Sequence, residues 1–109
     1  MKTIDPTKYT AHQHLGKFEG ETAATEYFHE QMLNGDGETV FADQVCDESL
    51  DYEPIDSAQF FHINADEAEA FNLPIGHWFL LREDSQGFAY GTTHATRAEA
   101  EQKFQSWIA

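Results

Sequence analysis

From Thr22 onward, the apolar positions of this chain recur at helical spacing. The stripe that we expect to face the core consists of Ala24, Tyr27, Phe28, Gln31 and Met32. Glu26 and Glu30 lie one turn apart on another stripe, which we expect to be exposed. The run of Asn, Gly and Asp at 34–37 predicts the end of this helix.

Three other segments in the first two thirds of the chain have strand composition. Lys8–Leu15 has the Tyr and Thr content of a strand, and Gly16 marks its end. Thr39–Val45 is predicted as a strand, although its composition leaves a helix open, and Gln59–Ile63 is predicted as a buried strand. Between the last two, Asp47–Asp56 is predicted to form an acidic loop.

The remaining third contains a short helix, a hairpin and a final helix. Asn64, with a Glu three residues later, predicts an N-capped helix that runs to about residue 72. His77–Arg82 and Phe88–His94 predict two strands of a hairpin. Thr96 and Glu99 predict a capping box, followed by an apolar helix face. That face consists of Ala100, Phe104, Trp107 and Ile108.

The predicted order is β-α-β-β-α-β-β-α over one domain spanning residues 1–109. We expect the α+β class, with an antiparallel or mixed sheet of about four or five strands and about three helices over one face. Phe60-Phe61 and Trp78-Phe79 place rings on both faces of their strands, which predicts central strands covered on both sides. A surplus of rings on one face would instead form a partner interface or a homodimer, which stays open.

The charge distribution is one-sided. The segment Phe18–Leu81 contains 15 Asp and Glu and no Lys or Arg, and the formal net charge of the protein is −14. A surface of this sign repels phosphates, so direct binding of nucleic acids or of anionic membranes is disfavoured. Basic protein surfaces are the favoured partners.

A docking site for a basic partner is the main functional hypothesis. Its predicted contact residues are Glu26, Glu30, Asp43, Asp47, Glu48, Asp51, Tyr52, Glu53 and Asp56, with Tyr52 as the non-ionic anchor. In its sharper form, the carboxylates imitate nucleic-acid phosphates and inhibit a nucleic-acid-handling protein, as phage or plasmid anti-CRISPR and antirestriction proteins do. Two interpretations without mimicry stay open: an acidic adaptor domain and a solvated acidic surface.

A metal site is the alternative hypothesis. His12, His14 and Glu19 form an H-x-H-x₄-E pattern, and both histidines would point to one face of a strand. Over these eight residues the spacing resembles the first metal motif of cupins, and the resemblance implies a divalent metal held by these side chains, with His77 as a further candidate. The chain departs from the cupin pattern because 11 residues before His12 are too few for the strands that a cupin places there.

Catalytic motifs are not found. The sequence contains no G-x-S-x-G and no H-E-x-x-H, and Cys46 is the only cysteine, so we expect a protein that is not an enzyme and needs no cofactor. The N-terminus has no apolar signal region. The longest apolar run is Trp78–Leu81, far short of the roughly 20 residues of a membrane span. We therefore expect a soluble cytoplasmic protein.

Overall fold

The computed structural model describes residues 4–9, 17–42, 55–84 and 88–108. The α+β class, the mixed sheet and the three α-helices are confirmed for this part of the chain. The elements are the 3-10 helix η1 (Pro6–Lys8), β1 (Lys17–Glu19), α1 (Thr22–Leu33), β2 (Glu38–Ala42), β3 (Ile55–His62), α2 (Ala65–Phe71), β4 (Trp78–Asp84), β5 (Phe88–His94) and α3 (Arg97–Ile108).

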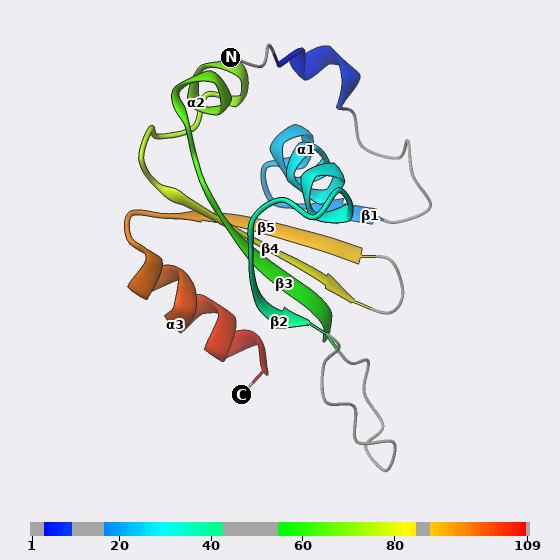
Figure 1. The fold of residues 1–109 in the computed structure, drawn as a ribbon, viewed down its shortest axis with the longest axis vertical. Helices are drawn as coiled ribbons and strands as arrows, with labels where there is room; N and C mark the ends of the chain where they lie inside the picture. The colour runs from blue at the N-terminus through cyan, green and yellow to red at the C-terminus, as the bar shows by residue number, and fades with distance from the viewer. Residues whose placement is uncertain (1–3, 10–16, 43–54, 85–87, 109) are drawn as a thin grey trace.

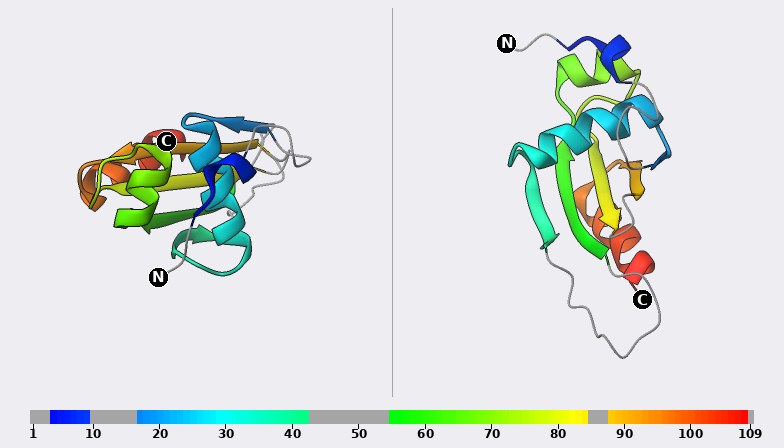
Figure 2. Two further views of the ribbon diagram at one scale, coloured as in Figure 1. Left: turned by 90° about the horizontal axis from the view of Figure 1, so that it is seen from above. Right: turned by 90° about the vertical axis from the view of Figure 1, so that its right-hand side faces the viewer.

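The described strands form one five-stranded sheet in the order β1-β5-β4-β3-β2. β1 pairs with β5 in parallel, whereas the other neighbours are antiparallel. Because β1 and β2 lie at opposite edges, the connection through α1 has to cross one face of the sheet (Figure 1). α2 lies in the connection between β3 and β4, at the same end of the molecule as η1 (Figure 2).

The helices cover both faces of the sheet, and the expectation of helices over one face is wrong. On one face, Tyr27 and Phe28 of α1 pack with Phe61, Phe79 and other side chains, and α2 packs against the same cluster. On the opposite face, Ala100 and Phe104 of α3 pack with residues that alternate with those: Ala58, Phe60 and Leu80. Successive side chains of a strand point to opposite faces, so neighbouring apolar residues in β3 and β4 require two covers.

Two glycines allow α1 to approach the sheet closely. A Cβ atom on Gly91 of β5 would lie 2.3 Å from Cζ of Phe79 and 2.3 Å from Oγ1 of Thr25. A Cβ on Gly20, whose φ is +66°, would lie 2.1 Å from the carbonyl oxygen of Gly91. The turn that leads into α1 therefore lies directly on β5, and the Thr25 hydroxyl donates to the carbonyl of Glu19 at 3.1 Å.

The largest differences from the expected element boundaries lie at the first strand and at the start of β3. Lys8 lies in η1 and not in a strand, the segment 10–16 is outside the described residues, and the first strand is Lys17–Glu19. β3 begins at Ile55, inside the segment predicted as an acidic loop, because Ile55 pairs with Asp84 of β4. Both differences arise from pairing with the distant β4–β5 hairpin, which has no local sequence signal.

Candidate functional site

The candidate site lies between α1 and α2, where a buried hydrogen bond joins the two helices. The Tyr27 hydroxyl of α1 donates to Oε2 of Glu67 of α2 at 3.0 Å, and Glu67 is 7% exposed. The other oxygen of Glu67 accepts from the backbone N–H of Asn64 at 3.0 Å, while the Asn64 side chain accepts from the Glu67 backbone at 2.8 Å. This is the predicted capping box, and it fixes the Glu67 carboxylate with two donors.

Burial and the adjacent carboxylate shift the pKa of the Tyr27 phenol in the same direction. Burial raises the pKa of the Tyr27 phenol, and the Glu67 charge raises it further. The phenol therefore stays protonated and keeps its donor role toward Glu67 across the physiological range. The ring also contacts Phe71 of α2 with a centroid separation of 5.2 Å, so a polar and an apolar contact hold the helices together.

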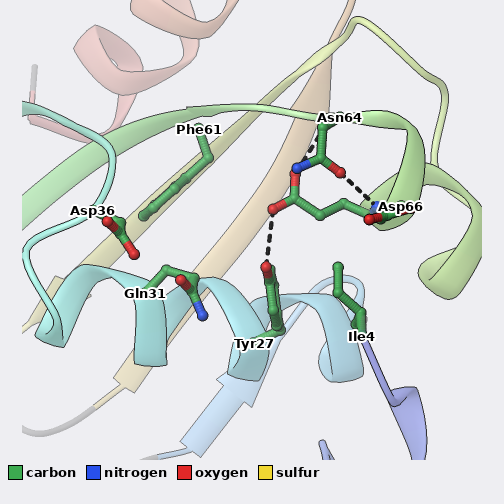
Figure 3. Close-up of a pocket in the computed structure, with 8 residues that line it drawn as sticks. Ile4, Tyr27, Gln31, Asp36, Phe61, Asn64 and Asp66 are labelled. Atoms are coloured by element: carbon green, nitrogen blue, oxygen red, sulfur yellow. Dashed lines mark hydrogen bonds between the residues drawn. The ribbon is translucent and has the colours of Figure 1, made fainter. Parts of the chain in front are cut away.

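A pocket of about 280 Å³ opens beside this hydrogen bond (Figure 3). Its walls come from the N-terminal segment, α1, the turn after α1, β3 and the start of α2. The lining residues are Ile4, Tyr27, Gln31, Asp36, Phe61, Asn64, Asp66 and Glu67. Three of them are carboxylates and none is Lys, Arg or His, so the pocket presents acceptors and negative charge between aromatic walls.

The two glutamates of α1 that were predicted to contact a partner are less exposed than expected. Glu26 is 0% exposed, so its predicted place on a surface that contacts a partner is wrong. Glu30 is half-buried and hydrogen-bonds to Tyr9, whose pKa is raised by burial and by the charge of Glu30. The N-terminal segment covers this part of α1, because Tyr9 packs edge-on against Tyr27 at 5.2 Å.

Most of the other predicted partner-binding residues belong to the segment between β2 and β3. Asp43, Asp47, Glu48, Asp51, Tyr52 and Glu53 lie outside the described residues, and Asp56 is described only as a backbone position in β3. Whether these carboxylates form one surface with Glu30 stays a prediction.

Of the three predicted metal ligands, the structure describes one. His12 and His14 lie outside the described residues, and Glu19 is an exposed residue of β1. His77, the further candidate, is half-buried in the turn that precedes β4, and its carbonyl accepts from the Ile63 backbone at 2.9 Å. Among the described residues, no group of three or more His, Cys, Asp or Glu side chains is arranged to hold a metal ion.

Sequence reasoning missed the pocket because its residues come from distant segments. Asp36 and Asp66 are 30 positions apart and neither belongs to a motif. The signal that could have found it is Gln31, an amide within the apolar stripe of α1. A polar side chain on a core-facing stripe requires a partner or a polar cavity.

Comparison with protein-family models, with curated proteins and with solved structures gives no match for this chain. Within the described residues, none of the helices has both the length and the apolar character required to cross a membrane.

Proposed function

We propose that this chain is a non-enzymatic acidic protein that docks on a basic surface of a nucleic-acid-handling protein. The observation that carries the proposal is the separation of charge between the two faces of the sheet. α1 and α2 cover the same face and contain neither Lys nor Arg, whereas α3 on the other face contains Arg97 and Lys103. The acidic segment of the sequence thus supplies both helices of one face.

The carboxylates on this side are available to a partner in several places. Glu21, Asp36 and Glu69 are exposed, and Asp66 and Glu30 are half-buried. A basic partner would be steered toward this face by long-range attraction, which raises the association rate at low ionic strength. Residues 43–56 add six further carboxylates to the proposed surface, and Tyr52 is the proposed anchor at its centre.

The sharper proposal is inhibition by imitation of nucleic-acid phosphates, in the manner of phage or plasmid counter-defence proteins. Duplex DNA carries about one charge per 1.7 Å of axis, so a mimic needs a dense row of carboxylates. Binding of the partner in competition with DNA or RNA would distinguish mimicry from an acidic adaptor, which would leave nucleic-acid binding by the partner intact.

The test is capture of partners from the native host at two salt concentrations, with matched charge variants. Reversal of Asp47 and Glu48 to Lys changes the net charge by the same amount as reversal of Glu99 and Glu101 on α3. We expect basic nucleic-acid-binding proteins to be captured, to be lost at high salt and to be lost in the first variant only. Capture that is insensitive to salt, or equal loss in both variants, would contradict the proposal.

A further inference from the structure

Residues 4–9 pack on α1 and α2, and we call them the N-terminal strap. Ile4 lines the pocket between α1 and the start of α2, beside Tyr27 (Figure 3). The Tyr9 ring packs edge-on against Tyr27 at 5.2 Å and against Phe71 of α2 at 6.0 Å, measured between ring centres. One aliphatic and one aromatic side chain therefore anchor the strap to both helices.

The attachment of the strap is weaker than that of the core elements. Each of its residues is half-buried or exposed. Within the described residues, the backbone N–H groups of Lys8 and Tyr9 donate at 3.1 and 3.2 Å to carbonyls of the strap itself, and no backbone hydrogen bond joins the strap to another element. A pocket of about 430 Å³ also remains between Pro6, the start of α1 and the end of α2. Terminal segments with so few ties to the core open at a lower free energy than the core does.

The strap covers groups that suit a basic partner. The Tyr9 hydroxyl hydrogen-bonds to Glu30 of α1, and burial, followed by the charge of Glu30, raises the pKa of this phenol, which therefore stays a donor. Detachment of the strap would free Glu30 and uncover the sides of the Tyr27 and Phe71 rings that Tyr9 contacts. A carboxylate beside aromatic rings is a site for Lys or Arg, whose charge pairs with the carboxylate while the apolar stem packs on the rings.

The strap also has the sign of charge that the proposed function assigns to the partner. Residues 1–9 contain two Lys and one Asp, whereas α1 and α2 contain acidic residues and no Lys or Arg. Lys8 is exposed at the end of η1. The strap thus brings an aliphatic residue, an aromatic residue and a net positive charge to an acidic pair of helices.

We propose that the N-terminal strap is an internal competitor, which a basic segment of the partner displaces from α1 and α2. The partner segment then occupies the places of Ile4 and Tyr9 and pairs with Glu30. A competitor in the same chain lowers the apparent affinity by the fraction of molecules in which the strap is detached, so a weaker strap means tighter binding. The inference rests on the proposed function for the nature of the partner, whereas detachment of the strap is testable without one.

The first test is whether the strap detaches while the rest of the protein stays folded. Tyr9→Ala removes the ring contacts and the hydrogen bond to Glu30, whereas Tyr9→Phe removes only the hydrogen bond. In native protein and Tyr9→Phe we expect NMR order parameters near those of rigid backbone for residues 4–9, about 0.85, and below about 0.6 in Tyr9→Ala. Unchanged order parameters in Tyr9→Ala, or loss of the α1 and β5 signals together with those of the strap, would overturn the inference.

The second test is rebinding of a synthetic peptide of residues 1–9 to the isotopically labelled Tyr9→Ala protein. We expect saturable shifts of the backbone amides of Tyr27, Glu30 and Phe71, with a dissociation constant of roughly 1 mM. The native protein should bind the peptide at least about 10-fold more weakly, because its own strap occupies the site. The same peptide with Tyr9→Ala is the control and should give no saturable shift. Equal binding to both proteins, or no saturable shift in either, would overturn the inference.

Capture of basic proteins from the native host separates this inference from the proposed function. We expect Tyr9→Ala to retain about 10-fold more of the proteins that native protein captures at the same salt concentration. Leu33→Ala, which truncates a side chain of α1 that is 65% exposed, is the control and should match native protein. Equal capture by native protein and Tyr9→Ala would refute the competitor and leave the proposed function standing. Capture of no basic protein by either would refute the proposed function and the partner named here, while rebinding of the peptide would still assign the strap to this site.

Discussion

The close packing of α1 on β5 predicts that Gly91→Ala destabilises the protein. The new methyl group would lie 2.3 Å from Cζ of Phe79 and 2.3 Å from Oγ1 of Thr25, whereas heavy atoms in contact prefer about 3.5–4.0 Å. Both neighbours are 0% exposed, and Phe79 is stacked on Phe28 at 4.4 Å, so neither can move aside without displacing the core.

Two opposing effects determine how much Gly91→Ala changes the free energy of unfolding. Insertion of a methyl group into a well-packed core costs about 1–3 kcal/mol, and the short contacts on two sides place Gly91→Ala at the upper end. Replacement of a strand glycine by alanine also reduces the entropy of the unfolded chain, which gains about 0.4–1 kcal/mol. The steric cost is larger, so we expect a net loss of about 2 kcal/mol in the free energy of unfolding.

The assay is urea denaturation followed by far-UV circular dichroism, with thermal unfolding as a second measurement. A loss of about 2 kcal/mol corresponds to a decrease of roughly 8 °C in Tm for a chain of this size. Phe79→Leu removes the ring atoms that the methyl group would meet. In that background we expect Gly91→Ala to cost at least about 1 kcal/mol less than in the native chain. Two results would refute the close approach of α1 to β5: a Gly91→Ala variant as stable as the native protein, or equal costs of Gly91→Ala in the native and Phe79→Leu backgrounds.

Four further predictions concern single side chains. Tyr27→Phe should reduce the free energy of unfolding by about 1–3 kcal/mol, because buried Glu67 loses a donor; an equally large cost in a Glu67→Ala background, where no side chain is left to accept, would contradict this pairing. Burial lowers the pKa of His94 in the folded protein below its ordinary value of 6.5. The neutral imidazole therefore contributes to stability above pH 6.5, and this contribution is lost as the pH falls toward the pKa of the folded state. An NMR titration that gives His94 a pKa at or above 6.5 would contradict this prediction. Glu38→Gln should change stability by less than about 1 kcal/mol, since its pairing with Arg97 is exposed. Arg97→Ala should cost more than Glu38→Gln, because the guanidinium also packs 5.0 Å from the Phe60 ring centre; equal costs in urea denaturation would contradict that contact.

The sequence by itself determined the elements whose signals are local. The helix at 22–33, the capping box of Asn64 and Glu67, and the strand at 88–94 depend on spacing and caps within a few residues, and the structure has them there. At the start of α3, the predicted contact of Thr96 with the Glu99 backbone is present at 3.2 Å. Short-range hydrogen bonds and helical periodicity require no knowledge of the rest of the chain.

Only the tertiary structure decided which of the acidic residues face solvent and which are covered. Glu26 lies off the apolar stripe of α1, yet it is 0% exposed, whereas Glu30, one turn later, is half-buried and hydrogen-bonds to Tyr9. The pocket likewise exists only because Asp36 and Asp66, 30 positions apart, are brought together by the packing of α1 and α2 on one face. Burial depends on contacts between distant segments, whereas net charge depends on composition. The sequence therefore determined the net charge of the protein, and the fold determined which of its carboxylates face solvent.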